Sequence, residues 1–339
     1  MSDSPVRVVV IGAGSIGERH LRCFGSTGRA TVSFVEPKPE LRNEVATRYP
    51  SARPLETLEQ ALAEECDVAV IATPAPLHVA QATAFVDRGT HVLIEKPLAV
   101  EEAGVQELGR LAEQRSRTVS VAYVYRAHPV LNEMREAIAS GRFGRPVELV
   151  AVCGQHFPFY RPAYRQTYYT RHETGGGAVQ DALTHIVNAG EWLVGPVGRL
   201  VADAKHCVLE GVDVEDTVHV LARQGDVVAS YSLNQHQAPN ETAITVICER
   251  GTARFEMHAC RWRECTTPGS DWIDHPRPPL ERDELFIRQA NSFLDVVASK
   301  SAPACDLAAG LQTLKVNRAI LASVTSGRWE TVGGRTPGE

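Results

Sequence analysis

The sequence lacks the features that mark membrane and nucleic-acid proteins. No window reaches the ~18 apolar residues needed to span a bilayer. No basic block occurs in a chain whose net charge is −6, so we expect neither a membrane nor a nucleic-acid partner. The N-terminus has no basic region followed by a separate apolar stretch, which argues against a signal peptide. These absences predict a cytoplasmic protein.

Paired cysteines at metal-binding spacing are also missing. The eight cysteines are scattered along the chain, a pattern typical of reduced thiols rather than of a disulfide framework. Only His258, Cys260 and Cys265 cluster, and no second cysteine pair stands at zinc-knuckle distance. We expect a strand with small buried thiols there and no metal site.

The first third of the sequence alternates apolar runs with helical stretches. Near-continuous apolar runs are typical of parallel strands that are buried on both faces. The predicted strands are Val6–Ile11, Thr31–Val35, Val68–Ala72, His91–Ile94 and Thr118–Ala122, with helices such as Leu77–Arg88 and Glu101–Glu113 between them. This order predicts βαβ units with right-handed crossovers, and hence a doubly wound parallel sheet.

After about residue 123 the continuous runs give way to alternation. In Asp226–Gln235 every second residue is apolar, and Thr242–Cys248 alternates as well. Such strands belong to a largely antiparallel sheet with one protected face. Helices are predicted at Ala178–Leu193, Asp283–Ala298 and Asp306–Ser326. We therefore expect an α/β protein with a nucleotide-binding domain over 1–122, an α+β domain with a large, mostly antiparallel open sheet over 123–332, and a flexible tail over 333–339.

A glycine-rich turn follows the first predicted strand directly. It reads G-x-G-x-x-G and opens the next helix, and the residues expected to contact a nucleotide there are Gly12, Gly14, Ser15, Ile16 and Gly17. The glycines permit a tight turn, close approach of a pyrophosphate and close helix packing, while the helix N-terminus supplies N–H donors. Glu36 ends the second strand, where a carboxylate accepts ribose hydroxyls and repels a 2′-phosphate. We expect a Rossmann domain that binds NAD; Lys38 nearby leaves NADP as the less favoured alternative.

Two further predicted strands end in polar residues at the edge where open parallel sheets bind ligands. One is followed by Thr73 and Pro74, the other by Glu95-Lys96-Pro97. Lys96 would stand beside a cationic nicotinamide in the oxidised complex. Partial burial and a neighbouring positive charge both lower the pKa of a lysine toward the range useful for proton transfer. Lys96 is therefore a catalytic candidate, and a surface lysine at a strand end is the alternative.

A second candidate pair, Asp181 and His185, follows the glycines Gly175–Gly177. Positions i and i+4 share one face of a helix, so both side chains can point into one cleft. His185 can exchange a proton near neutral pH because the reference pKa of histidine is ~6.5. Asp181 can bind a substrate hydroxyl or hold the imidazole in one tautomer. A solvated surface pair is the alternative.

These motifs, in this order, resemble the Gfo/Idh/MocA oxidoreductases, named for glucose–fructose oxidoreductase and inositol dehydrogenase. The resemblance covers nearly the whole chain. It is carried by G-x-G-x-x-G with His20 after it, T-P-x-x-x-H ending at His78, E-K-P at Glu95–Pro97, Tyr123–Pro129, Gly141–Gly144, the triple glycine, and D-x-x-x-H ending at His185.

The resemblance implies hydride transfer between a polyol carbon and C4 of the nicotinamide. Lys96 takes the place of the family's active-site lysine, and Asp181 and His185 match its substrate-binding and proton-transfer positions. The residues that fall where the family contacts the nucleotide are Thr73, Pro74, His78, Glu95, Lys96 and Tyr125. Asn188 stands where the family often has an acidic residue, which leaves the proton path from His185 open.

The segment Gln155–Tyr169 resembles the family's substrate loop. Its donors and flat rings suit the faces of sugars, and its clustered arginines and tyrosines could also bind a phosphate or carboxylate. The residues expected to contact substrate are Arg126, His156, Tyr164, Arg165, Tyr168, Asp181 and His185. An aromatic loop packed on the sheet is the alternative.

Together these observations predict an NAD-dependent dehydrogenase acting on a secondary alcohol of a sugar, cyclitol or nucleotide-sugar. Two alternatives stay open: a glycoside hydrolase that uses NAD as a recycled helper, and an NAD-sensing regulatory protein without catalysis. The resemblance also implies a homodimer or homotetramer assembled through the C-terminal sheet.

Overall fold

The computed structural model describes residues 4–334, which divide into two compact units. Unit 1 contains the chain up to Ala127 and the segment Glu281–Leu311, and unit 2 contains His128–Leu280 and the chain from Gln312. The division falls inside helix α10 (Leu307–Ser326). The expected domain boundaries at 122/123 and 332/333 stay a prediction, and most of the expected tail lies outside the described residues.

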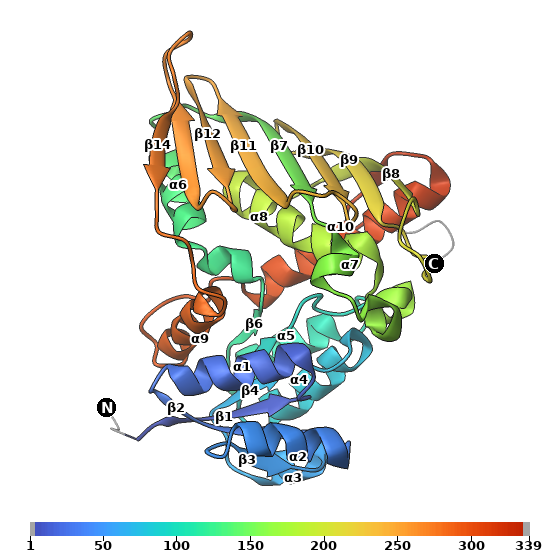
Figure 1. Cartoon of the computed structure of the whole chain (residues 1–339). Helices are drawn as coiled ribbons and strands as arrows, with labels where there is room; N and C mark the ends of the chain where they lie inside the picture. The colour runs from blue at the N-terminus through green and yellow to red at the C-terminus, as the bar shows by residue number, and fades with distance from the viewer. Residues whose placement is uncertain (1–3, 335–339) are drawn as a thin grey trace. The chain divides into compact units, whose positions relative to one another are not determined.

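Unit 1 is built on a six-stranded sheet with the order β3-β2-β1-β4-β5-β6 (Figure 1). The strands are β1 (Val6–Ile11), β2 (Ala30–Val35), β3 (Arg53–Leu55), β4 (Val68–Ile71), β5 (His91–Ile94) and β6 (Val119–Val121). Every pair of neighbours is parallel. The predicted doubly wound sheet is confirmed, with the short β3 as an addition.

Helices cover both faces of this sheet. They are α1 (Ser15–Ser26), α2 (Pro39–Arg48), α3 (Leu58–Ala63), α4 (His78–Asp87), α5 (Val105–Arg115) and α9 (Glu284–Val297). Val8 and Val10 of β1 join the apolar cluster with residues of α1 and α9, whereas Val9 and Ile11 join the cluster with residues of α4 and α5. Burial on both faces explains why β1 reads as a continuous apolar run.

Unit 2 is built on a nine-stranded sheet with the order β14-β13-β12-β11-β7-β10-β9-β8-β15. The strands are β7 (Pro146–Gly154), β8 (Arg199–Lys205), β9 (Thr217–Gln224), β10 (Val227–Asn234), β11 (Glu241–Cys248), β12 (Gly251–Glu256), β13 (Arg261–Cys265), β14 (Ile273–Pro276) and β15 (Glu330–Thr331). Of the neighbouring pairs, β7 and β10 are parallel and the others are antiparallel. The mostly antiparallel sheet is therefore confirmed.

One face of this second sheet packs against α6 (Pro129–Ala139) and α8 (Thr184–Val194). The predicted inward residues of β10, among them Ala229 and Tyr231, are buried. The predicted helix Ala178–Leu193 differs in detail, because a π-helical turn at Val179–Leu183 precedes α8. Within residues 4–334, no helix combines the length and the apolar character needed to cross a membrane.

Candidate active site

In the glycine turn after β1, open space surrounds Gly14, whereas Gly12 and Gly17 are closely packed. Gly12 has φ +90°, a region that favours glycine, and a Cβ on Gly17 would lie 1.8 Å from the carbonyl oxygen of Gly12. A Cβ on Gly14, in contrast, would meet no atom within 4 Å. Gly14 is the N-cap of α1 and offers no side chain to its first N–H groups. The turn therefore fits a pyrophosphate, which requires close approach to backbone donors at a helix N-terminus.

Glu36, at the end of β2, is buried against this turn. Its carboxylate accepts the N–H of Ala13 at 3.2 Å and that of Lys38 at 3.0 Å. An ionised carboxylate has about four acceptor positions, so capacity remains for ribose hydroxyls. Nη1 of Arg42 donates to the carbonyl oxygens of Glu36 and Pro37, and its Nη2 lies 3.9 Å from Oε1 of Glu56. This arrangement fits NAD.

The ends of β4 and β5 lie along the same edge as the glycine turn, because β1, β4 and β5 are consecutive in the parallel sheet. A Cβ on Gly12 would lie 3.3 Å from Cγ2 of Thr73, which follows β4 with Pro74. Lys96 follows β5, is half-buried, and its N–H donates to the Glu95 carboxylate at 3.0 Å. The structure thus brings together the glycine turn, Thr73 and the segment that carries Lys96.

His78 is buried between the two loops that follow β4 and β5. Its Nε2 lies 2.7 Å from the carbonyl oxygen of Thr73, and its Nδ1 lies 3.0 Å from that of Pro97. Burial lowers the pKa of His78. The ring therefore joins the two loops, and its expected contact with the nucleotide stays a prediction.

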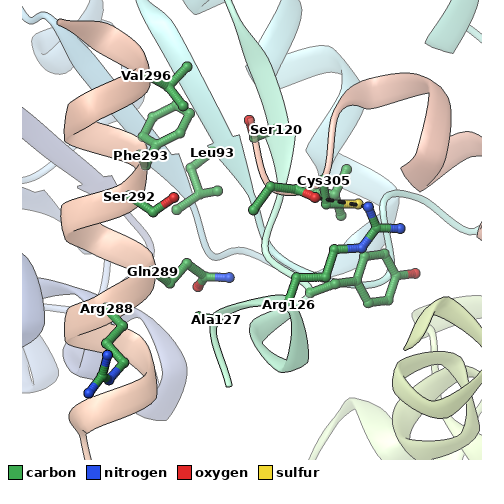
Figure 2. A pocket seen from close by; sticks show the side chains of 13 residues that line it. Leu93, Ser120, Arg126, Ala127, Arg288, Gln289, Ser292, Phe293, Val296 and Cys305 are labelled. Carbon is green, nitrogen blue, oxygen red and sulfur yellow. Dashed lines mark hydrogen bonds between the residues drawn. The ribbon is translucent and has the colours of Figure 1, made fainter. Parts of the chain in front are cut away.

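Tyr125 and Arg126 lie in the short 3-10 helix η2 (Val124–Ala127) after β6. Arg126 donates to the carbonyl oxygen of Ala304 at 2.8 Å and lines a pocket on the α9 side of the sheet (Figure 2). Leu93 and Ser120, from β5 and β6, also line this pocket, whereas the glycine turn does not. This cavity is thus distinct from the nucleotide edge, and the substrate contact of Arg126 stays a prediction.

In unit 2 the structure brings together two of the expected substrate residues. The Tyr168 hydroxyl donates to Oδ1 of Asp181 at 2.6 Å. Asp181 lies in the π-helical turn and His185 is the second residue of α8, so a π-helical turn takes the place of the uniform helix that was expected. π-helical turns occur frequently at functional sites.

Residues that the sequence did not single out hold this π-helical turn. The N–H of Val179 donates to Oε1 of buried Glu215 at 2.9 Å, and Nε2 of His172 lies 2.5 Å from Oε2 of Glu215. A Cβ on Gly177, whose φ is +85°, would lie 2.6 Å from Glu215. The hydrogen bond to Glu215 raises the pKa of His172. The triple glycine was the available signal, because it marked a close approach without naming the partner.

Three other expected substrate residues make contacts with the protein itself, two of them with the loop between β8 and β9. Tyr164 is buried and donates to the carbonyl oxygen of Glu210 at 2.7 Å. Arg165 donates to the same oxygen and pairs with the Glu210 carboxylate at 3.2 Å. His156 accepts the N–H of Phe159 at the start of α7 (Phe157–Tyr160). Their roles toward substrate stay predictions.

The two cysteines of the cluster lie close to backbone carbonyl oxygens. Cys260 is buried, with its sulfur 3.1 Å from the Pro278 carbonyl oxygen, and Cys265 ends β13. Over residues 4–334, no group of three or more His, Cys, Asp or Glu side chains is placed to hold a metal ion.

Comparison with known families covers most of both units. Residues 6–123 match the oxidoreductase family with an NAD-binding Rossmann fold, and residues 131–254 match the GFO/IDH/MocA C-terminal domain. The chain belongs to the Gfo/Idh/MocA oxidoreductase family. It is therefore an NAD-binding oxidoreductase.

Individual members of the Gfo/Idh/MocA family are similar to this chain over much of their length. The inositol 2-dehydrogenase of Acidothermus cellulolyticus is 30% identical over 240 residues, covering 69% of this chain and 67% of that protein. Levoglucosan dehydrogenase, solved with NADH and levoglucosan, shares the fold with a TM-score of 0.89 at 20% identity, over 98% of this chain and 100% of that one. The WlbA dehydrogenase from Bordetella pertussis, solved with NADH and UDP-GlcNAcA, has a TM-score of 0.84 at 26% identity, over 98% and 99% of the two chains.

Asn188, the departure from the Gfo/Idh/MocA pattern, is buried in α8. Its Nδ2 donates to Oγ1 of Thr313 in α10 at 3.0 Å, and the Thr313 hydroxyl donates to Glu191 at 2.7 Å. The side chain therefore contributes to packing between two helices of unit 2.

Proposed function

We propose that this chain oxidises a secondary alcohol of an uncharged polyol, either a cyclitol or a monosaccharide, and that NAD accepts the hydride. Relatives named inositol 2-dehydrogenase support the substrate class. The observation that carries the proposal is the position of Lys96, two residues after the end of β5 and on the same sheet edge as the glycine turn. Neither the hydrolase nor the regulatory alternative gains support from the relatives.

Each residue has a defined part in this proposal. The N–H groups of the glycine turn and of α1 hold the pyrophosphate, and Glu36 accepts from ribose hydroxyls. Bound NAD supplies the hydride acceptor. Lys96 or His185 removes the proton of the substrate hydroxyl, and Asp181 accepts a hydrogen bond from a second hydroxyl. Fixing the reacting carbon and acceptor at roughly 3–3.5 Å would account for much of the rate gain.

Charge in the substrate loop favours an uncharged substrate. The Tyr168–Asp181 pair presents a carboxylate, which accepts hydrogen bonds from hydroxyls and repels anions. Arg165, one of the clustered arginines that could bind a phosphate or carboxylate, is paired with Glu210. A nucleotide-sugar such as the UDP-GlcNAcA bound by WlbA is therefore the less favoured substrate.

The test is a turnover panel with NAD and myo-inositol, other cyclitols, glucose, levoglucosan and UDP-linked sugars, followed by NADH absorbance and product analysis. We expect NADH to form with a cyclitol or monosaccharide. Turnover confined to UDP-linked sugars would refute the uncharged substrate. Product without net NADH would indicate the hydrolase, and ligand binding without turnover on any member would indicate the regulator.

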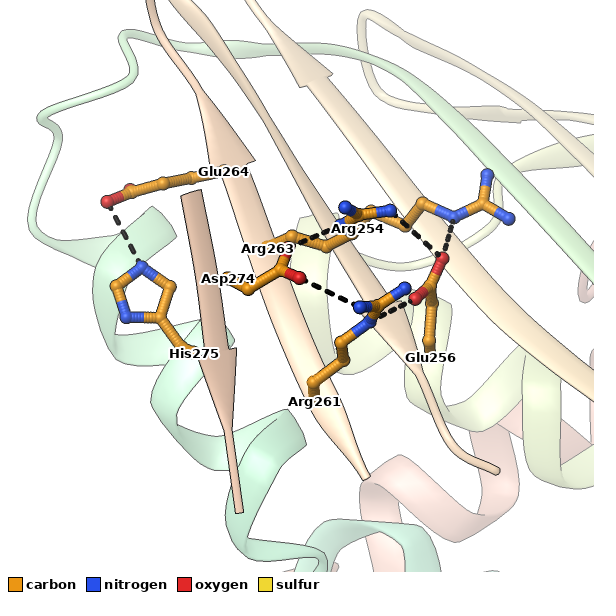
Figure 3. A network of polar contacts seen from close by, with 7 residues as sticks. All are labelled: Arg254, Glu256, Arg261, Arg263, Glu264, Asp274 and His275. Atoms are coloured by element: carbon orange, nitrogen blue, oxygen red, sulfur yellow. Dashed lines mark hydrogen bonds and ion pairs between the residues drawn. The ribbon is translucent and has the colours of Figure 1, made fainter. Parts of the chain in front are cut away.

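We also propose that the protein forms a homodimer or homotetramer through the open face of the unit 2 sheet. Leu221 of β9 and Val228 of β10 are 55% and 44% exposed on this face. Toward β14 the face carries a network in which Glu256 pairs with Arg254 and Arg261, and Asp274 pairs with Arg261 and Arg263 (Figure 3). Apolar side chains beside internally paired charges suit a surface that a second copy covers.

A further inference from the structure

His20 belongs to the motif after the glycine turn, yet nothing in the nucleotide fingerprint requires it. It lies in α1 with 1% of its surface exposed. Its Nε2 is 2.5 Å from Oε1 of Glu95, which is 5% exposed. Burying an ionisable group is costly unless it is hydrogen-bonded, so each of these side chains depends on the other.

The second oxygen of Glu95 reaches the catalytic candidate. Oε2 accepts the N–H of Lys96 at 3.0 Å, while the N–H of Glu95 itself donates to Ile71 in the ordinary ladder with β4. The carboxylate therefore stands where β5 ends and sheet pairing no longer holds the chain. At Lys96 the hydrogen bond to the N–H comes from this carboxylate rather than from a neighbouring strand.

The ring of His20 is held from its other side by α9. Phe286 meets it edge-on with ring centroids 5.5 Å apart, and the Arg19 guanidinium covers Phe286 at 4.9 Å. Arg22 of α1 forms a two-point ion pair with Asp283, at 2.5 and 2.7 Å, just before α9 begins. The start of α9 thus packs against α1 beside His20, and the His20–Glu95 contact is almost inaccessible to water.

We infer that His20 is a positioning residue for Lys96. His20 holds the Glu95 carboxylate, and this carboxylate holds the backbone N–H of Lys96. The backbone at Lys96 therefore keeps one conformation, and that conformation sets the direction of the side-chain amine. Without the imidazole the carboxylate turns toward solvent and the Lys96 segment loosens. The inference rests on the proposed catalytic role of Lys96.

Hydrogen exchange of single amides tests the inference without a substrate. In His20→Leu the Lys96 N–H should exchange about tenfold faster, the expected effect of losing one hydrogen bond. The N–H of Glu95, bonded to Ile71, should not change. His20→Gln, which keeps a donor near the position of Nε2, should restore most of the protection.

Kinetics with the polyol that is oxidised fastest in the panel provide the second readout. A catalytic group misplaced by about 1 Å can lose on the order of 10²-fold in rate, so kcat of His20→Leu should fall by about 10–100-fold while KM and the Kd for NAD change little. The isotope effect of a substrate deuterated at the reacting carbon should rise, because the chemical step becomes slower.

Unchanged exchange at Lys96 in His20→Leu would overturn the inference, and so would faster exchange with unchanged kcat. If His20→Leu does not fold, Glu95→Leu, which removes the acceptor of the Lys96 N–H, must show the faster exchange at Lys96 instead. Normal turnover by Lys96→Ala would defeat the proposed function but would leave the exchange result standing, so the two failures can be told apart.

Discussion

At the scale of single residues, the two glycines that flank the start of α1 have different reasons to be glycine. A Cβ on Gly17 would overlap the Gly12 carbonyl, whereas a Cβ on Gly14 has open space. We predict that Gly17→Ala lowers the free energy of unfolding by about 1–3 kcal/mol, the usual cost of overpacking. Urea denaturation measures this cost.

Gly14→Ala is the matched control for that variant. Its stability should stay within about 0.5 kcal/mol of the parent, but its affinity for NAD should fall because the methyl group enters the space where the pyrophosphate approaches. Unchanged NAD affinity in a titration of Gly14→Ala would contradict the placement of the pyrophosphate.

Glu36 gives a prediction about cofactor choice. Glu36→Gln keeps the size of the side chain and removes the charge that would repel a 2′-phosphate. We expect the preference for NAD over NADP, measured as the ratio of the two Kd values, to fall by about tenfold or more, since like-charge contacts cost several kcal/mol. A ratio equal to that of the parent would show that the carboxylate does not set the preference.

Residues were predictable where their partners are close in the sequence. The glycine turn and Lys96 stand in short local patterns, so the sequence singled out both as candidates. His20 and Glu95 are 75 positions apart, and Val179 and Glu215 are 36 apart. No periodicity links such pairs, because only the folded chain brings them together.

At the scale of elements, the π-helical turn that carries Asp181 depends on Glu215 and, through it, on His172. Glu215 raises the pKa of His172 above its unfolded value of ~6.5. The stabilisation by this pair is therefore complete below about pH 6.5 and is lost as the pH rises through the folded pKa.

We predict that His172→Gln loses stability relative to the parent near pH 6 and matches the parent at clearly alkaline pH. The side chain of His172 is 43% exposed, so the difference should stay below about 1 kcal/mol. Urea denaturation across pH measures the difference.

His78→Gln is a control whose stability should depend on pH in the opposite direction. Burial lowers the pKa of His78, so the contribution of His78 to stability is present above about pH 6.5 and is lost as the pH falls. A His172→Gln difference independent of pH would contradict the account.

Elements were predictable where burial imposes a period. β1 and β10 follow from a continuous and an alternating apolar pattern. β3 was missed because only Leu55 of its three residues is buried. The α-to-π change was missed because it depends on the Glu215 contact rather than on local composition. The burial of Tyr164 against Phe157 and Tyr169 was likewise not visible in the sequence, because it depends on how the loop folds.

At the scale of the whole molecule, the proposed assembly through the unit 2 sheet can be tested with two exposed apolar residues. Leu221 lies on the open face, and Val208, which is 54% exposed, lies in the loop between β8 and β9. We predict that Leu221→Arg lowers the mass of the assembly in sedimentation experiments and that Val208→Arg does not. Stability should change by no more than about 0.5 kcal/mol in either variant. A monomeric parent, or an unchanged mass for Leu221→Arg, would contradict the proposal.

The two-sheet architecture was predictable at this scale, but the path of the chain was not. The change near residue 123 from continuous apolar runs to alternating apolar residues predicted a second, antiparallel sheet. The sequence did not indicate that Glu281–Leu311 belongs to unit 1. The pattern of α9 is that of any amphipathic helix, and its partners in α1 lie more than 250 positions away in the sequence.

The most direct test of the central claim compares Lys96→Ala with Lys38→Ala, measuring kcat on the best polyol and the Kd for NAD by fluorescence titration. We expect Lys96→Ala to lower kcat by about 10²–10⁴-fold with a much smaller change in Kd. Lys38 is an exposed lysine beside Glu36, so Lys38→Ala should keep the parent kcat. Near-normal turnover by Lys96→Ala would show that the amine after β5 takes no part in the chemistry.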